Sequence, residues 1–206
     1  MSDRYLLPLA QAASAAYTAV PWFATKTCQV SRSVVLEYPT YAFRGTDTAL
    51  EWLVDFMAPD VPFYQHPIVG PIHLGFYLDI RTAVAAIAAD LAALGWPSFL
   101  LCGHSKGAGE AELAELDMKL LGHPPLAVRA YEPPCVGTAA LAKFLADGDH
   151  GWTKTVNASG ADIVTQVPDW PEWCHYGVET QLRVPDSDGI AAKHEIPAVL
   201  AALAAL

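Results

Sequence analysis

A serine stands between two glycines in the segment Gly-His-Ser-Lys-Gly, residues 103–107. The apolar run 99–102 predicts a strand and residues 108–121 predict a helix, so Ser105 lies at a sharp turn between the two. Gly-x-Ser-x-Gly in this setting is typical of a nucleophile elbow, because small glycines permit the tight turn and the N–H of the next residue, Lys106, points into the same space as the serine oxygen. The segment therefore predicts a nucleophilic serine.

A serine hydroxyl becomes a good nucleophile when a base removes its proton, and the usual base is a histidine oriented by a carboxylate. In the α/β-hydrolase arrangement these partners follow the serine in the order Asp or Glu, then His. Asp162 lies in the loop that directly follows a predicted strand at 153–156, and His194 precedes an apolar helix that starts at Pro197. The chain order therefore predicts a triad of Ser105, Asp162 and His194.

Other acidic and imidazole side chains compete for these two roles. Three carboxylates remain alternatives to Asp162: Asp169, Asp186 and Asp188. His175 remains an alternative to His194 as the base. Four acids of the helix after the elbow are expected to form its solvated face: Glu110, Glu112, Glu115 and Asp117. Five further histidines are not expected to act as the base, on chain order or position: His66, His73, His104, His123 and His150.

Strands and helices are predicted to alternate along the chain. The predicted helices are 9–20, one from about 73 to 94, 108–121, 139–146 and the terminal one, and the predicted strands are 33–38, 40–43, 99–102, 126–131 and 153–156. Such alternation favours a mostly parallel sheet covered by helices on both faces, with the chemistry beyond the carboxyl ends of the strands. Thr46, in the glycine turn after strand 40–43, is placed there to supply a second oxyanion donor, although the segment taken alone favours an ordinary strand-to-loop turn.

The composition limits the class of protein. The chain has 206 residues, a formal net charge of -10 and 53% hydrophobic residues, which fits one domain and argues against a nucleic-acid partner. The longest apolar stretch, 83–96, is too short for a membrane span and contains Asp90. Residues 5–15 match a signal peptide poorly, so we expect a helix of the mature fold there and a cytoplasmic rather than a secreted protein.

The four cysteines, Cys28, Cys102, Cys135 and Cys174, contain no Cys-x-x-Cys pair, so neither a zinc site nor a redox dithiol is indicated. Cys102 is expected to be a buried apolar residue, and one disulfide among the other three stays open. The predicted chemistry needs neither a metal nor an organic cofactor.

Six segments, in order, resemble the class 3 lipase family, the fungal-type triacylglycerol lipases and their bacterial and feruloyl esterase relatives. They are Ala-Phe-Arg-Gly-Thr-Asp at 42–47 with Trp52, His-Leu-Gly-Phe at 73–76, the elbow at 103–107, Pro-Cys-Val-Gly at 134–137, Asp-Ile-Val at 162–164 with Pro168, and His-Tyr-Gly-Val-Glu at 175–179. They cover most of the chain from residue 41 to residue 194.

The resemblance implies a single α/β-hydrolase domain over residues 1–206 that hydrolyses lipid or small acyl esters through an acyl-enzyme. It implies the triad Ser105, Asp162 and His194, with Thr46 and the backbone N–H of Lys106 as the oxyanion hole. It assigns His175 to a non-catalytic segment. It also implies a lid at about 47–63 and transient contact with a lipid interface.

Several residues depart from the family pattern. Lys106 and Ala108 stand where the family usually has a hydrophobic residue and a glycine, and Cys135 and Thr138 stand where it commonly has Arg and Asn. Any side chain at position 106 leaves the backbone N–H in place, so the mechanism is preserved, but a charge beside the nucleophile argues against a fully apolar acyl pocket. The alternative is a catalytically silent hydrolase fold used for binding. Neither the acyl chain length nor the oligomeric state follows from the sequence.

Overall fold

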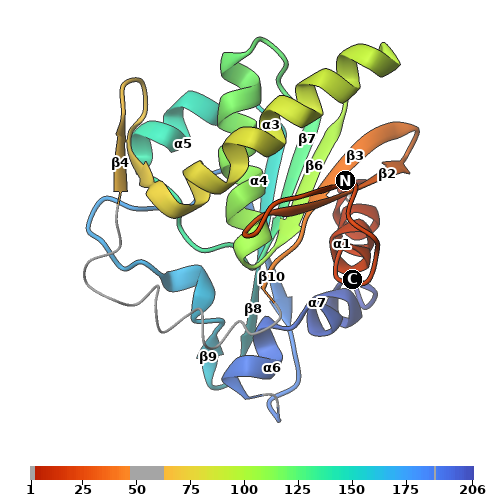
Figure 1. Cartoon of the computed structure of the whole chain (residues 1–206). Coiled ribbons are helices and arrows are strands. Elements are labelled where there is room, and N and C mark those ends of the chain that lie inside the picture. Colours follow the sequence, from red (N-terminus) through yellow and green to blue (C-terminus); the bar gives the residue numbers. More distant parts are fainter. Residues whose placement is uncertain (1–2, 47–62, 188) are drawn as a thin grey trace.

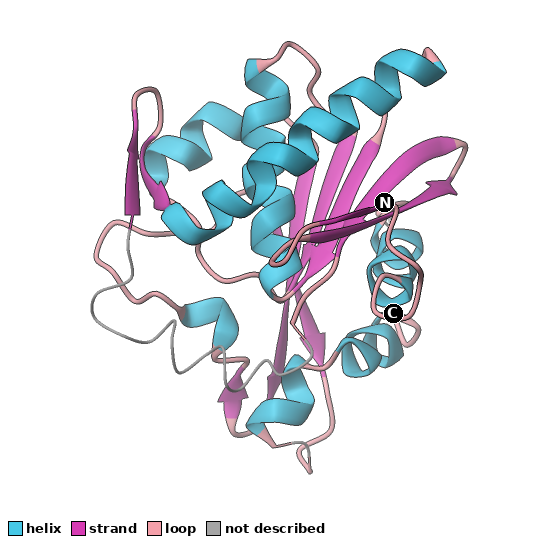
Figure 2. Ribbon diagram, viewed as in Figure 1, coloured by secondary structure: helices cyan, strands magenta, loops and turns pink. Residues whose placement is uncertain are grey.

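The computed structural model describes residues 3–46, 63–187 and 189–206, and its middle layer is one twisted sheet (Figures 1 and 2). The strand order is β1-β2-β3-β6-β7-β8-β10, with β9 paired to β8. The strands are β1 Phe23–Ala24, β2 Gln29–Val35, β3 Tyr38–Phe43, β6 Leu100–His104, β7 Ala127–Tyr131, β8 His150–Asn157, β9 Gly160–Ala161 and β10 Val178–Arg183. A separate hairpin pairs β4 (Phe63–His66) with β5 (Gly70–His73).

The centre of the sheet is parallel. The pairs β3–β6, β6–β7, β7–β8 and β8–β10 are all parallel, whereas β1, β2 and β9 pair antiparallel at the margins. Every residue of β6 and β7 is buried, as expected for parallel strands that are covered on both faces. The prediction of a mostly parallel sheet with helices on both faces is confirmed.

Helices cover the two faces (Figure 1). On one face lie α3 (Leu74–Leu94), α4 (Lys106–Leu120) and α5 (Ala139–Leu145), packed into the larger hydrophobic core. On the other face lie α1 (Leu6–Ala15) and α7 (Ile196–Leu203), which pack against each other and the sheet. Two short helices, α6 (Ile190–His194) and η1 (Val164–Gln166), lie near the carboxyl edge of the sheet. Because α3 buries Ile80, Val84, Ile87 and Leu91 at spacings of three and four, its predicted core face is confirmed.

Two elements differ from the sequence prediction. The break between the first two long strands falls at Leu36 and Glu37, whose φ angles are 48° and 72°, and not at Pro39, which pairs with Val34 inside β3. Two successive residues with positive φ form the tight hairpin turn that matches strand twist. Strand β10 was not expected, because only Leu182 of its six residues is buried and its sequence carries no apolar alternation.

The expectation of a solvated acidic face on the helix after the elbow is wrong. Glu110, Glu112 and Glu115 are 0%, 1% and 3% exposed, and only Asp117 among the four acids is partly exposed. Helix α4 packs against α3, β3, β6 and β7, so it lies inside the protein. Its acids are buried because Lys106 of the same helix and His150 of β8 meet them, a form of burial that is tolerated for charges.

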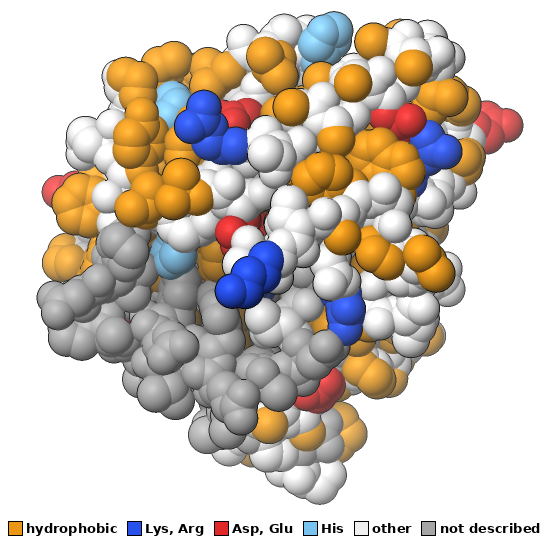
Figure 3. All heavy atoms as spheres, in the orientation of Figure 1, with side chains coloured by type: hydrophobic (Ala, Val, Ile, Leu, Met, Phe, Trp, Pro, Cys, Tyr) orange, Lys and Arg blue, Asp and Glu red, His pale blue; other side chains and the backbone are white. Residues whose placement is uncertain are grey.

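On the face in Figure 3, basic side chains are dispersed among acidic and hydrophobic ones and form no basic patch. None of the described helices has the length and apolar character needed to cross a bilayer. All four cysteines are free thiols, so the disulfide that the sequence left open is not formed. The predicted lid at 47–63 lies, apart from Phe63, outside the described residues.

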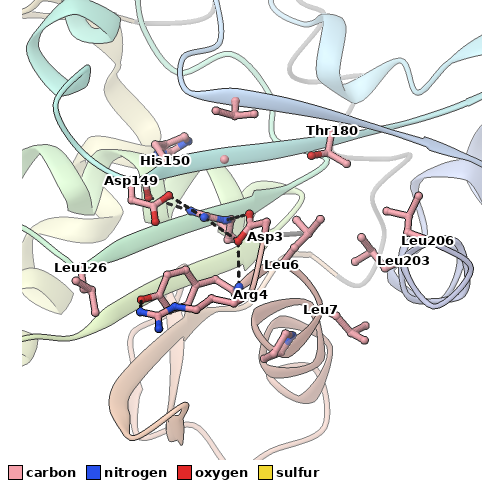
Figure 4. A pocket seen from close by; sticks show the side chains of 15 residues that line it. Asp3, Arg4, Leu6, Leu7, Leu126, Asp149, His150, Thr180, Leu203 and Leu206 are labelled. Atoms are coloured by element: carbon pink, nitrogen blue, oxygen red, sulfur yellow. Dashed lines mark hydrogen bonds and ion pairs between the residues drawn. The ribbon is translucent and has the colours of Figure 1, made fainter. Parts of the chain in front are cut away.

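A cavity of about 1140 Å³ lies at the amino ends of β7, β8 and β10 (Figure 4). Apolar side chains of α1 and α7 form one wall of this cavity. Arg129 also lines the cavity and forms ion pairs with Asp3 and Asp149 at 2.6 and 2.7 Å. Ser105 follows the carboxyl end of β6, so this cavity and the predicted chemistry belong to opposite ends of the sheet.

Candidate active site

The backbone at Ser105 has the conformation of a nucleophile elbow. Its φ is 58° and its ψ is -129°, a strained region for a residue with a Cβ. The two flanking glycines permit close packing: a Cβ on Gly103 would lie 2.1 Å from the carbonyl oxygen of Gly107, and one on Gly107 would lie 2.2 Å from that of Phe43. The N–H of Ser105 donates to the carbonyl of Tyr131 at 2.9 Å, which ties the turn to β7.

Three elements bring the predicted triad residues together. Nε2 of His194, at the end of α6, lies 2.7 Å from Oγ of Ser105, and its Nδ1 lies 2.5 Å from Oδ2 of Asp162, just after β9. Oδ1 of Asp162 accepts the N–H of Val164 at 3.1 Å. All three side chains are buried, at 0%, 3% and 0% exposure for Ser105, His194 and Asp162.

These contacts define the protonation states. Asp162 can only accept while it is ionised, so Nδ1 of His194 donates to it and Nε2 is left to accept the Ser105 hydroxyl. Burial by itself would raise the pKa of Asp162, but the hydrogen bond from His194 and the attraction of that ring outweigh it and hold the pKa below its usual range. The arrangement can take a proton from Ser105 and stabilise the imidazolium that results.

His104 holds the segment that carries His194. Its Nε2 donates to the backbone carbonyl of His194 at 2.7 Å, and its Nδ1 accepts the hydroxyl of Tyr17 at 2.7 Å. Burial lowers the pKa of His104 to about 3, so the ring is neutral and has the tautomer that these two bonds require. The sequence excluded His104 as a base, but no pattern in it indicated the Tyr17 contact.

The two predicted oxyanion donors lie beside the elbow. A Cβ on Gly45 would be 3.2 Å from Cβ of Ser105, which places the Gly45–Thr46 turn against the nucleophile. The hydroxyl oxygen of Thr46 is buried and has no partner within the part of the chain that the structure describes. Lys106 is the first residue of α4, where backbone N–H groups have no acceptor inside the helix. A cavity of about 310 Å³ is lined by Thr46, Lys106 and other residues of 26–29 and 44–45.

The Lys106 side chain is engaged with other side chains of the protein. Its Nζ lies 2.9 Å from Oδ2 of Asp79 on α3, donates to the carbonyl of Thr27 at 2.7 Å and forms an ion pair with Glu110. Burial by itself would lower the pKa of Lys106, but the two carboxylates outweigh it and raise the pKa above its usual value. The positive charge after the serine is therefore neutralised inside the protein.

The alternative base His175 and the alternative acid Asp186 are engaged elsewhere. His175 donates from Nε2 to the carbonyl of Thr165 at 2.9 Å and stacks on Trp152 with ring centroids 4.0 Å apart. Asp186 accepts the N–H of Ala158 at 2.9 Å. Asp188 lies outside the described residues. Within the described ranges, the side chains that hydrogen-bond to the ring of His194 are Asp162 and Ser105 alone.

One further carboxyl group reaches the site. Glu132, the first residue after β7, has a carboxyl oxygen within 4.8 Å of a carboxyl oxygen of Asp162 and a ring nitrogen of His194. Among the described residues this group alone has the spacing that a metal ion would need, but hydrogen bonds within the cluster and to β8 already engage its atoms. We therefore interpret it as a hydrogen-bonded chain. Its sequence signal, an acid directly after a predicted strand, is the one that indicated Asp162.

A family model described as lipase (class 3) matches residues 40–171, more than half of the chain. The chain belongs to the class 3 lipase family. The secreted mono- and diacylglycerol lipase A of Penicillium cyclopium is 31% identical over 114 residues, which cover 50% of this chain and 35% of the relative. The protein of the same name from Penicillium camembertii matches equally well. The chain thus spans about a third of the length of the curated relatives that it matches.

Solved structures of this family agree in fold. A triacylglycerol lipase from Penicillium expansum superposes with a TM-score of 0.68 at 19% identity, covering 97% of this chain and 87% of that one. A mono- and diacylglycerol lipase from Aspergillus oryzae gives a TM-score of 0.66 at 23% identity, covering 81% of this chain and 64% of that one. The predicted α/β-hydrolase fold is confirmed.

The comparison with this family corrects the expected location. Both curated relatives are named as secreted lipases, which contradicts the cytoplasmic expectation and points to an extracellular location. The residues on which that expectation rested form α1, where Leu9, Ala10 and Ala13 pack in the core. Their composition therefore reflects the packing of the fold and carries no information about the compartment.

Proposed function

We propose that the chain is a carboxylic ester hydrolase that acts on lipid or small acyl esters through an acyl-enzyme. The observation that carries the proposal is the pair of contacts made by His194, 2.7 Å to the Ser105 hydroxyl and 2.5 Å to the Asp162 carboxylate. The first distance lets His194 take the Ser105 proton, and the second lets Asp162 orient the imidazole. Membership of the class 3 lipases supports the same reaction class.

In the proposed reaction, Oγ of Ser105 attacks the ester carbonyl carbon while His194 takes the hydroxyl proton at Nε2. The carbonyl oxygen becomes an oxyanion that accepts hydrogen bonds from the N–H of Lys106 and the hydroxyl of Thr46. His194 then gives its proton to the departing alcohol oxygen, and the acyl group stays on Ser105. Water repeats the steps with His194 as the base, which releases the acid. Asp162 keeps its charge and orients the imidazole throughout.

The substrate class follows from the relatives and from Lys106. The relatives are named as lipases of mono-, di- and triacylglycerols, so a glycerol ester is the first substrate to test. The ion pairs of Lys106 with Asp79 and Glu110 neutralise the charge after the nucleophile, which removes the main objection to an apolar acyl chain. Transient contact with a lipid surface is part of the proposal.

The test is covalent labelling by a fluorophosphonate together with hydrolysis of a short and a long p-nitrophenyl ester. We expect labelling and hydrolysis by the wild-type chain, and a loss of at least about 10⁴-fold in Ser105→Ala. Ser33→Ala is the matched control, because Ser33 is exposed on β2 and should leave both activities unchanged. Preference for the long ester indicates a lipase and preference for the short one an esterase. Absence of labelling in the wild-type chain would contradict the proposal and favour a catalytically silent binding protein.

A further inference from the structure

Glu132 occupies an unusual place for an acidic residue. It follows the carboxyl end of β7, next to the strand that ends at Ser105, and its side chain is 0% exposed. Its φ is 53°, in the left-handed region that favours glycine. A glycine would adopt this conformation without strain, so the contacts of the Glu132 carboxyl group must hold it there.

Those contacts satisfy one side of the carboxyl group. Oε2 accepts the N–H of Thr155 at 3.0 Å and its hydroxyl at 3.3 Å, and Oε1 accepts the hydroxyl of Thr153 at 3.1 Å. All three donors belong to β8, the strand after which Asp162 follows. The carboxyl group is therefore fixed against β8, within 4.8 Å of ligand atoms of Asp162 and His194.

The remaining contact is with Asp162. Carboxyl oxygens of Glu132 and Asp162 lie within 4.8 Å of each other and both side chains are 0% exposed, and a hydrogen bond between two carboxyl groups requires that one of them carries a proton. Two ionised carboxylates at this separation in a dry site would repel each other strongly. The buried Lys193, next to His194 in sequence, does not neutralise this pair, because its ammonium group donates to Asn157, Ser159 and Gly160.

The proton belongs to Glu132. Asp162 already accepts from His194 and from a backbone N–H, which stabilise its ionised form. Burial, and next the charge of Asp162, raise the pKa of Glu132 well above its usual range. The titratable groups that face Glu132 are Asp162 from the loop after β9 and His194 from α6, whereas β8 presents only uncharged threonines.

We propose that Glu132 is a positioning residue whose neutral carboxyl group donates a hydrogen bond to Asp162 and holds that carboxylate against Nδ1 of His194. This inference rests on the proposed function, because it concerns the same triad. The neutral donor fixes the plane of the Asp162 carboxylate. It also leaves the two carboxyl groups beside His194 with a single negative charge between them. A second charge there would favour the imidazolium and raise the pH needed for a neutral base.

The experiment compares Glu132→Gln and Glu132→Met with the wild-type chain. Fluorophosphonate labelling rates are measured against pH, and infrared spectra at pH 7 record the carbonyl stretch of protonated carboxyl groups. The amide of Glu132→Gln keeps a neutral donor of the same shape, so we expect labelling within about threefold and an unchanged acid midpoint. Glu132→Met keeps the volume but loses the donor, so labelling should slow by about tenfold to about a hundredfold, as for a lost hydrogen bond to a charged group.

The infrared spectra test the proton directly. We expect Glu132→Gln to lose one acid carbonyl band that the wild-type chain shows. Glu37→Gln is the matched control for backbone strain, because Glu37 is exposed at a φ of 72° and should change neither the bands nor the labelling.

Two results would overturn the inference. If Glu132 is ionised, Glu132→Gln removes a negative charge beside His194, and the acid midpoint of labelling moves to lower pH with no band lost. If Glu132 only fills space, Glu132→Met labels as fast as the wild-type chain. Failure of the proposed function looks different, because the wild-type chain then does not label at all while the acid band of Glu132 is still present.

Discussion

His150 stabilises the folded chain, and this contribution to stability is lost at alkaline pH. It starts β8, and both of its ring nitrogens face buried acids of α4: Nδ1 lies 2.8 Å from Oε2 of Glu115, and Nε2 lies 3.3 Å from Oε1 of Glu112. Two carboxylate neighbours require two donors, so the ring is an imidazolium. Burial by itself would lower the pKa of His150, but the two carboxylates outweigh it and raise the pKa to about 9.

The magnitude follows from this pKa. A rise from the usual 6.5 to about 9 corresponds to roughly 3 kcal/mol at 1.36 kcal/mol per pH unit. The folded state binds the extra proton, so this stability is complete below pH 6.5 and is lost as the pH rises through about 9. For a domain of this size 1 kcal/mol changes Tm by about 2–4 °C, so Tm should fall by about 6–12 °C between pH 6.5 and 9.5.

The assay is thermal unfolding followed by circular dichroism between pH 6 and 9.5. The reference is the triple variant His150→Gln, Glu112→Gln, Glu115→Gln, which replaces the three charges by neutral amides of similar shape. Other titrating groups contribute equally in both proteins and cancel in the difference between them. We expect the Tm difference between wild type and variant to shrink as the pH rises. Parallel curves over the whole range would refute the assignment of a buried imidazolium.

Three further outcomes are expected. Lys106→Met leaves Glu110 buried without its cation and should lower the free energy of unfolding by about 3–5 kcal/mol in denaturant titrations. The double variant with Glu110→Leu should regain most of this free energy, and no regain would contradict the pairing. Thr46→Val should reduce kcat for a p-nitrophenyl ester by about 10²–10³-fold and Thr46→Ser much less, and equal rates would rule Thr46 out as a donor. Gly107→Ala, whose Cβ would collide with a carbonyl of β3, should abolish soluble protein, whereas Gly189→Ala, in open space, should express normally.

Much of the fold could be predicted from local signals, and the residues of the proposed triad could be chosen from the elbow motif and from chain order. The apolar spacing of α3 and the buried runs of β6 and β7 report the core directly. The elbow glycines indicate a tight turn, because a side chain at either position would collide with the backbone. Asp162 and His194 could be proposed because chain order and strand ends restrict where a triad can be assembled.

What could not be predicted depends on partners that are distant in sequence. The acids of α4 look like a solvated face until Asp79, Lys106 and His150 are seen to surround them. Strand β10 has the polar composition of a loop and becomes a strand because β8 offers it six paired positions. The Tyr17–His104 contact joins residues 87 positions apart, and no single-sequence pattern carries such a contact.

The buried charges of α4 also constrain how this sequence can diverge. Lys106 and Glu110 bind each other, and Glu112 and Glu115 share His150, so a substitution at one member leaves a buried charge without its partner. The effects of substitutions within each group are therefore strongly epistatic. A lineage that gains an apolar residue after the nucleophile should first, or at the same time, have lost the acid at position 110. Libraries for laboratory evolution of this helix should accordingly vary each charged group as a unit, because one-at-a-time scans would classify every position as intolerant.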